Sequence, residues 1–199
     1  MRYPLPLSLL LLLTLLMSTP LLAAKNVDLD YYVKLLPQSD QAEVRLTLSK
    51  GEAVRSLDFD LGNKGDYSAF KADGEWRPNA GQTVGSQRGV WRPASGKASL
   101  TYRVRISHAH TPASLASSKV VSFDTRMTPA WALMRGEDLV PPARLDQQDG
   151  TQLVSRLEFE LPSGWVSVET AWPRIGKNRF RIDNISRLFD RPTGWMLAG

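Results

Sequence analysis

The two histidines of the chain stand two positions apart, and their type and spacing suit metal binding. His108 and His110 lie in the segment ISHAHTP, residues 106–112. On an extended strand alternate side chains point to the same face, so this spacing can present two imidazoles to one metal ion. A third ligand is not identifiable, and an Asp or Glu from another strand would have to complete the site. The alternative, which we favour, is a pair of histidines at a strand end, leading into the loop at Pro112.

The rest of the chain offers little that indicates catalysis. The sequence contains no H-E-x-x-H, no G-x-S-x-G and no glycine-rich phosphate loop. Two histidines in one tripeptide leave little scope for a Ser-His-Asp arrangement. Carboxylate pairs occur two residues apart, as in residues 58 and 60 and residues 158 and 160, on what the pattern predicts to be solvent-facing strand positions. We therefore predict no catalytic residue and no cofactor site in this chain.

A local repeat places two tryptophans beside two arginines. Residues 74–81 (GEWRPNAG) recur as residues 89–96 (GVWRPASG), with the shared frame G-x-W-R-P-x-x-G. Because proline cannot donate to a central ladder, each copy is predicted to be a short strand that runs into a turn. One interpretation is that exposed Trp rings form stacking platforms for a ligand such as a sugar. Its candidate ligand-binding residues are Trp76, Arg77, Trp91 and Arg92.

The other interpretation of this repeat is structural. Two tryptophans would close one end of a β domain while arginine side chains cover their faces. Large aromatic residues in a small β domain are usually buried, and for this reason we favour the structural interpretation.

The elements that must position these residues are indicated by alternation with period two. Apolar residues occupy every second position, with polar or charged residues between them, as expected for half-buried antiparallel strands. Gly, Pro and Asn punctuate the intervals. We predict an all-β fold, an antiparallel β-sandwich with one or two short helical turns, near residues 129–135 and 184–189. Residues 127–149 are expected to form a long connection across the sandwich. The alternating segments are residues 27–35, 44–48, 57–61, 100–106, 157–161 and 180–182.

The first 24 residues predict export. A basic start, an apolar stretch over residues 5–16, a Thr19-Pro20 break and an Ala23-Ala24 site are typical of a cleavable secretory signal peptide. The alternative is a retained membrane anchor, but a span needs about 20 apolar residues and this stretch is shorter. We predict that residues 1–24 are removed, that residues 25–199 form one β-sandwich domain, and that the protein is periplasmic or secreted, with no membrane span after cleavage.

Composition excludes several further classes. The chain of 199 residues has no cysteine, which excludes disulfides, a thiol nucleophile and thiolate zinc sites. Together with the short signal, this absence indicates a bacterial envelope protein. The formal net charge is +5, but the basic residues are interleaved with acidic ones, whereas nucleic-acid-binding proteins usually carry a dense basic stripe. We therefore predict no nucleic-acid partner.

The C-terminal segment carries a resemblance to a known family. Residues 180–192 (FRIDNISRLFDRP) contain Leu188, Asp190 and Pro192 in the spacing L-x-D-x-P. This resembles the end of the N-terminal β-domain of the glycyl-aminopeptidase-like (gluzincin) metallopeptidases, where an L-x-D-S-P element precedes the catalytic domain; Arg191 replaces the usual Ser. The order of features upstream is also similar, including a Tyr-Arg-Val strand at residues 102–104. The W-x-P-G-x-Y segment of the family is missing.

The resemblance implies a non-catalytic module. The zinc ligands and general-base Glu of the family lie in a domain that this chain does not contain, so zinc is implied only for that missing domain. Residues 195–199 (WMLAG) resemble the start of an apolar strand, and we expect the native chain to continue past Gly199 into a C-terminal catalytic domain. The alternative is a free-standing periplasmic binding module that holds a glycan or envelope partner through Trp76 and Trp91. A small metal carrier that uses both histidines is a third interpretation.

Overall fold

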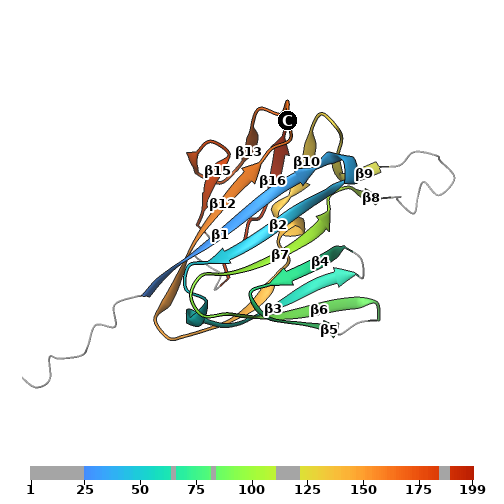
Figure 1. Ribbon diagram of the computed structural model, residues 1–199. Coiled ribbons are helices and arrows are strands. Elements are labelled where there is room, and N and C mark those ends of the chain that lie inside the picture. Colours follow the sequence, from blue (N-terminus) through green and yellow to red (C-terminus); the bar gives the residue numbers. More distant parts are fainter. Residues whose placement is uncertain (1–24, 64–65, 82–83, 111–121, 184–188) are drawn as a thin grey trace, which may run out of the picture.

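The computed structural model describes residues 25–63, 66–81, 84–110, 122–183 and 189–199, and its strands form three sheets (Figure 1). The seven-stranded sheet has the order β14 (Arg174–Gly176), β15 (Arg179–Ile182), β12 (Thr151–Glu160), β1 (Lys25–Leu36), β2 (Gln41–Leu48), β7 (Ala98–Arg105), β4 (Tyr67–Ala72). The five-stranded sheet has the order β13 (Val168–Thr170), β16 (Trp195–Ala198), β10 (Ala132–Arg135), β9 (Ser122–Met127), β8 (His108–His110). The four-stranded sheet has the order β11 (Ala143–Gln147), β3 (Val54–Asn63), β6 (Ser86–Pro93), β5 (Gly74–Ala80).

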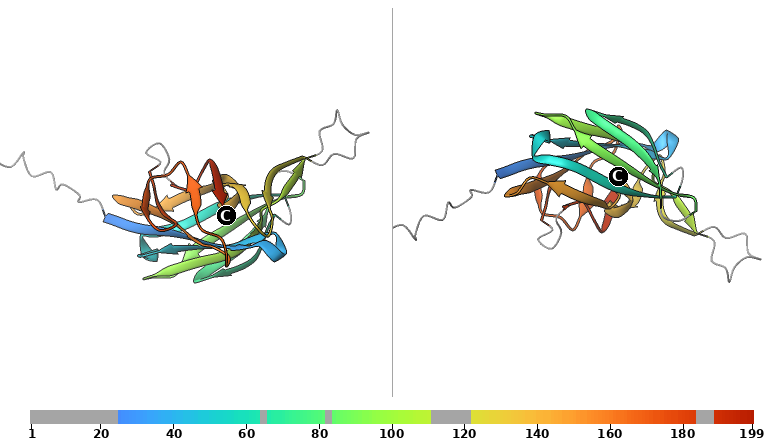
Figure 2. Two further views of the ribbon diagram at one scale, coloured as in Figure 1. Left: turned by 90° about the horizontal axis from the view of Figure 1, so that it is seen from above. Right: turned by 90° about the horizontal axis from the view of Figure 1, so that it is seen from below.

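The predicted all-β sandwich is confirmed, and the views from above and below show strands in layers, edge-on (Figure 2). The helices of the described ranges are single turns, namely η2 (Pro37–Ser39), η3 (Gly51–Ala53) and α2 (Gly136–Leu139). Within the described part of the chain, no helix has the length and apolar character needed to cross a membrane. The predicted signal peptide, residues 1–24, lies outside the described residues.

All six alternating segments of the sequence form strands, in β1, β2, β3, β7, β12 and β15. In β1 the apolar positions are completely buried while the residues between them are half-buried, as an apolar row packed on the core requires. One pair departs from the antiparallel expectation. β1 runs antiparallel to β2, placing Tyr31 opposite Leu46, but parallel to β12, placing Tyr31 beside Leu157.

The prediction for residues 127–149 is wrong. Instead of a long connection the structure has β10, α2 and β11, and the helical turn expected at residues 129–135 is mostly strand β10. β10 has only four residues, and β11 buries neither of its faces deeply, so neither strand produces a clear alternation. The other turn, expected at residues 184–189, falls largely outside the described residues.

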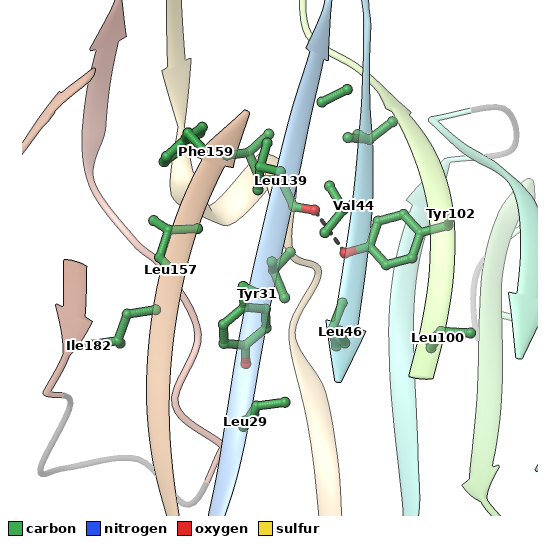
Figure 3. Packing of buried hydrophobic residues seen from close by; sticks show 14 of the residues in the cluster. Leu29, Tyr31, Val44, Leu46, Leu100, Tyr102, Leu139, Leu157, Phe159 and Ile182 are labelled. Carbon is green, nitrogen blue, oxygen red and sulfur yellow. Dashed lines mark hydrogen bonds between the residues drawn. The ribbon is translucent and has the colours of Figure 1, made fainter. Parts of the chain in front are cut away.

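Tyrosine hydroxyls tie the segment around α2 and the C-terminal segment to the seven-stranded sheet. The Tyr102 hydroxyl donates to the Leu139 carbonyl at 2.8 Å (Figure 3). The Tyr31 hydroxyl donates to the Asp190 carbonyl. Because buried carbonyls need donors, these bonds allow irregular backbone to lie inside the core. Tyr67 and Arg191 make similar contacts, with the carbonyls of Asp138, Glu137 and Val140.

The two copies of the Trp-Arg-Pro repeat form adjacent antiparallel strands, β5 and β6. Their register sets Trp76 opposite Trp91, and the Gly of each copy opposite the Pro of the other. A Cβ on Gly89 would lie 2.1 Å from the Trp76 ring, so glycine leaves the space that this ring fills. Pro78 is tolerated within β5 because β5 is an edge strand.

Candidate functional site

His108 opens β8 and lines a pocket of about 290 Å³ with Asp60, Asp66, Tyr67 and Asp138 among its walls. Its Nε2 atom is buried and has no hydrogen-bond partner among the described residues. Burial raises the pKa of the Asp138 carboxyl above its ordinary value, and the nearby His108 opposes this shift. The pocket is therefore lined by three aspartates, and the carboxyl of Asp138 is only partly removed from water.

Metal binding at this place has limited geometric support. Within the described ranges, no three His, Asp or Glu side chains form a group that could hold a metal ion. The side chain of His110 falls outside what the structure describes, so the pairing of the two histidines stays a prediction. The metal-carrier interpretation rests on one placed imidazole, His108.

Neither tryptophan of the repeat stands fully at the surface. Trp91 is 0% exposed, and its indole Nε1 donates to the Asp73 carbonyl at 3.0 Å. Trp76 is half-buried and stacks on Phe70, with ring centroids 4.3 Å apart and ring planes 14° from parallel. Burial leaves Trp91 no surface on which a sugar could stack.

The arginines of the repeat do not cover the tryptophan rings. Arg77 and Arg92 both bind Glu75, at 2.5 and 3.0 Å, and these contacts, with Arg92 first, lower the pKa of the Glu75 carboxyl. Successive residues on a strand point to opposite faces, so an arginine that directly follows an inward tryptophan points outward. The expectation that arginine shields the rings is wrong for this reason.

Three of the four carboxylates in the pairs noted in the sequence are engaged in ion pairs between strands, and the fourth, Asp60, accepts a hydrogen bond from the Gly62 amide at 3.2 Å. Asp58 binds Arg88 at 2.9 Å, and Glu158 lies 3.6 Å from Arg179. Such cross-strand pairs stabilise a solvent-facing sheet surface modestly and leave no free acid–base pair at these positions. Glu160 has the same role, 2.7 Å from Lys34.

Sequence reasoning missed an apolar stripe on the outward face of the five-stranded sheet. It lies on β10 and β16, the strands labelled near the C-terminus in Figure 1. Register places Leu133 of β10 opposite Leu197 of β16, and Arg135 opposite Trp195. Trp195 and Leu197 are 48% and 51% exposed, and the Arg135 guanidinium lies 4.4 Å from the centre of the Trp195 ring. We call Trp131, Leu133, Trp195 and Leu197 the apolar stripe. The unbroken apolar run WMLA in β16 was the signal, since a strand covered on both faces has no polar row.

Comparison with known proteins gives a fold but no sequence relative. No protein-family model matches the chain, and no curated protein matches it significantly. An aminopeptidase N family protein from Idiomarina loihiensis has a TM-score of 0.54 at 16% identity, over 86% of this chain and 29% of that chain. Native leukotriene A4 hydrolase from Saccharomyces cerevisiae scores 0.42 at 12% identity, over 89% and 28% of the two chains. A two-domain M1 zinc metallopeptidase scores 0.38 at 13% identity, over 89% and 42%.

The likeness to the Idiomarina structure shows that this chain shares its fold with part of that aminopeptidase N family protein. The resemblance predicted from the C-terminal motif is therefore confirmed at the level of the fold. The chain spans less than a third of the length of the first two structures it matches.

Proposed function

We propose that this chain is an exported, non-catalytic β-sandwich module that packs against a zinc-dependent, aminopeptidase-type catalytic domain and supports it. The observation that carries the proposal is the apolar stripe on the five-stranded sheet. The chain matches only 29% of the length of the Idiomarina structure, which supports the proposal that it is one domain of a larger protein.

The five-stranded sheet is apolar on both of its faces at β16 and at residues 132–134 of β10, next to Arg135, whose guanidinium lies over the Trp195 ring. Met134 and Met196 are almost completely buried on the inward face, while Trp195 and Leu197 remain half in water on the outward face. Burying apolar surface contributes about 25 cal/mol per Å², and contiguous exposed apolar patches mark interaction sites. A sheet that is apolar on both faces fits best between two layers, and here only one layer is supplied by the described residues.

Sequencing the gene beyond the Gly199 codon tests the larger assembly. We expect an open frame that encodes H-E-x-x-H, the motif by which two histidines bind zinc with Glu as general base. A stop codon at that place, or a long continuation without the motif, would sink the aminopeptidase part of the proposal.

The docking role is tested in that longer protein with a double substitution, Trp195→Ser and Leu197→Ser. We expect the rate of hydrolysis of an aminoacyl-coumarin substrate to fall at least about tenfold, or the melting temperature of the catalytic domain to drop, because the interface loses its apolar contacts. The matched control, Arg103→Ser with Glu43→Ser, removes a pair 3.8 Å apart on the seven-stranded sheet. Equal behaviour of the two double variants would contradict docking through the apolar stripe.

Export is part of the proposal and has its own test. N-terminal sequencing of the protein recovered from a bacterial periplasm is expected to begin at Lys25, because a signal peptidase cuts after small residues such as Ala23-Ala24. Recovery of an intact N-terminus in the membrane fraction would show a retained anchor.

A further inference from the structure

The outward face of the seven-stranded sheet carries a polar groove at β2 and β7. It consists of two adjoining hollows of about 380 and 170 Å³, which share Arg45, Thr47 and Lys97 as lining residues. Ser99 lines the larger hollow and Tyr32 the smaller one. The larger hollow reaches the lower end of the roughly 300–1,000 Å³ typical of small-molecule sites.

Strand register gives the groove a symmetrical arrangement of cations about two hydroxyl-bearing residues. Thr47 of β2 lies opposite Ser99 of β7. Arg45 precedes Thr47 by two residues on β2, and Lys97, in the bend directly before β7, precedes Ser99 by two residues. Because β2 and β7 run antiparallel, the two cations lie on opposite sides of this pair, and both line the groove. With a rise of about 3.4 Å per residue, each cationic side chain starts about 7 Å along the strand from the pair, within its own reach.

Neither Arg45 nor Lys97 is held in an ion pair among the described residues, although the charge of Arg45 helps to lower the pKa of the Glu160 carboxyl. Arg156 is held by Asp28 at 2.7 Å and by Asp30 at 3.5 Å, and Arg179 lies near Glu158. By contrast, no carboxylate in the described part of the chain forms an ion pair with Arg45 or Lys97.

The remaining groups of the groove suit hydroxyl-rich ligands. Arg45 lies over the Tyr32 ring at 4.7 Å, which holds the guanidinium near the sheet and closes this ring to stacking. Asp73 accepts hydrogen bonds from the amide and hydroxyl of Ser99 and retains acceptor capacity on its carboxylate, since an ionised carboxylate has about four lone-pair positions. Asp30 lines the smaller hollow and offers a second carboxylate acceptor there.

We propose that this groove binds an acidic saccharide, a sugar ring that carries a carboxylate or phosphate substituent. The acidic substituent lies over the Thr47 and Ser99 pair, where Arg45 provides a forked donor and Lys97 a point charge. The sugar hydroxyls donate to the carboxylates of Asp30 and Asp73. The groove lies on a different sheet from the apolar stripe, so the proposal stands whether or not the chain docks on a catalytic domain.

Calorimetric titration of the full chain with four probes tests the proposal: glucuronate, glucose 6-phosphate, glucose and inorganic phosphate. We expect at least one of the two acidic sugars to bind with a Kd of about 1 mM or tighter. Glucose and inorganic phosphate are expected to bind at least about tenfold more weakly, because each makes only one of the two sets of contacts. Comparison of the two acidic sugars tells which acid group the site takes.

Substitutions then locate the site. Arg45→Gln and Lys97→Gln are each expected to weaken binding about fivefold or more, and the double variant to abolish it, while Arg103→Gln on the same sheet leaves it unchanged. Far-UV circular dichroism checks that each variant is folded. The proposal is overturned if neither acidic sugar binds, if glucose or inorganic phosphate binds as tightly as the acidic sugars, or if the folded double variant retains full affinity.

Discussion

The outward faces of the seven-stranded and five-stranded sheets meet water in different ways. On the seven-stranded sheet, ion pairs join neighbouring strands, as between Lys34 and Glu160 at 2.7 Å and between Arg156 and Asp28 at 2.7 Å. On the five-stranded sheet the outward positions of β16 are apolar, with Trp195 and Leu197 about half exposed, and charged residues lie beside them on the neighbouring strands, Arg135 on β10 and Glu169 on β13. The inward faces of both sheets are apolar and buried, so only the outward faces differ.

This difference separates residues that stabilise the chain itself from residues available to a partner. A buried apolar residue contributes to folding through the water it excludes and the packing it completes. A half-exposed one has contributed only part of that free energy, and the rest is available for association. In this sense the outward faces of β2 and β7 are complete, since their outward residues are polar, whereas that of β16 is not; in the seven-stranded sheet Ile175, on the edge strand β14, is 48% exposed.

The largest effect is expected from a matched pair of Leu→Ala substitutions. Leu46 on the inward face of β2 is 0% exposed and Leu197 is 51% exposed. Leu46→Ala should lower the free energy of unfolding by about 2–5 kcal/mol, since it removes buried methyl groups and leaves a cavity. Leu197→Ala should cost less than about 1 kcal/mol in this chain. Urea denaturation followed by Trp fluorescence measures both, and equal losses would break the distinction between the two positions.

A smaller effect is expected from two Tyr→Phe substitutions on opposite faces of the seven-stranded sheet. The buried Tyr102 hydroxyl donates to the Leu139 carbonyl, and its removal leaves that carbonyl without this donor, at a cost of about 1–2 kcal/mol. The Tyr32 hydroxyl donates to the Glu160 carboxylate, a bond that raises the pKa of Tyr32 to about 12. Water can replace it there, so Tyr32→Phe should cost less than about 0.5 kcal/mol at neutral pH. Urea denaturation separates the two, and a larger loss for Tyr32→Phe would contradict this view of the outward face.

The seven-stranded sheet was largely predictable from the sequence because its long strands have one wet and one buried face. In β1 and β7 each apolar residue of the alternation is in the core, and each polar residue between them lies at or near the surface. Pattern analysis detects this arrangement because the period of two is sustained over eight or more residues. The C-terminal L-x-D-x-P motif added the resemblance that the fold comparison confirms.

The five-stranded sheet and the segment around α2 were not predictable in the same way. β10 and β16 have four residues each, and β16 is apolar throughout, so no alternation marks which face is inward. Irregular backbone near Leu139 is stabilised by Tyr102 from a strand 37 residues away, a contact that local sequence does not encode. The polar groove requires register, because only the pairing of Thr47 with Ser99 brings Arg45 and Lys97 to the same surface.

The smallest effect concerns Asp138 in α2, a turn connected to both sheets. It follows β10 of the five-stranded sheet, and the hydroxyl of Tyr67, on β4 of the seven-stranded sheet, donates to the backbone carbonyl of Asp138. Burial raises the pKa of the Asp138 carboxyl in the folded chain, although His108 and Arg135 oppose the shift. A raised folded pKa means that the neutral form is favoured. The stabilising contribution is then fully present below the unfolded pKa of about 3.9 and is lost as the pH rises through the folded pKa.

Asp138→Asn keeps a neutral side chain at every pH and so removes this loss. The melting temperature of the variant relative to the original chain should rise between about pH 3.5 and pH 7, by about 1–3 °C for a chain of this size. Differential scanning calorimetry at the two pH values measures the change, with the exposed Asp124→Asn as control. A relative melting temperature that falls over the same range would show that the charged carboxylate is the favoured form. In that case the charge of Asp138 would be compensated at the rim of the His108 pocket, as charges are by ion pairs on the outward face of the seven-stranded sheet.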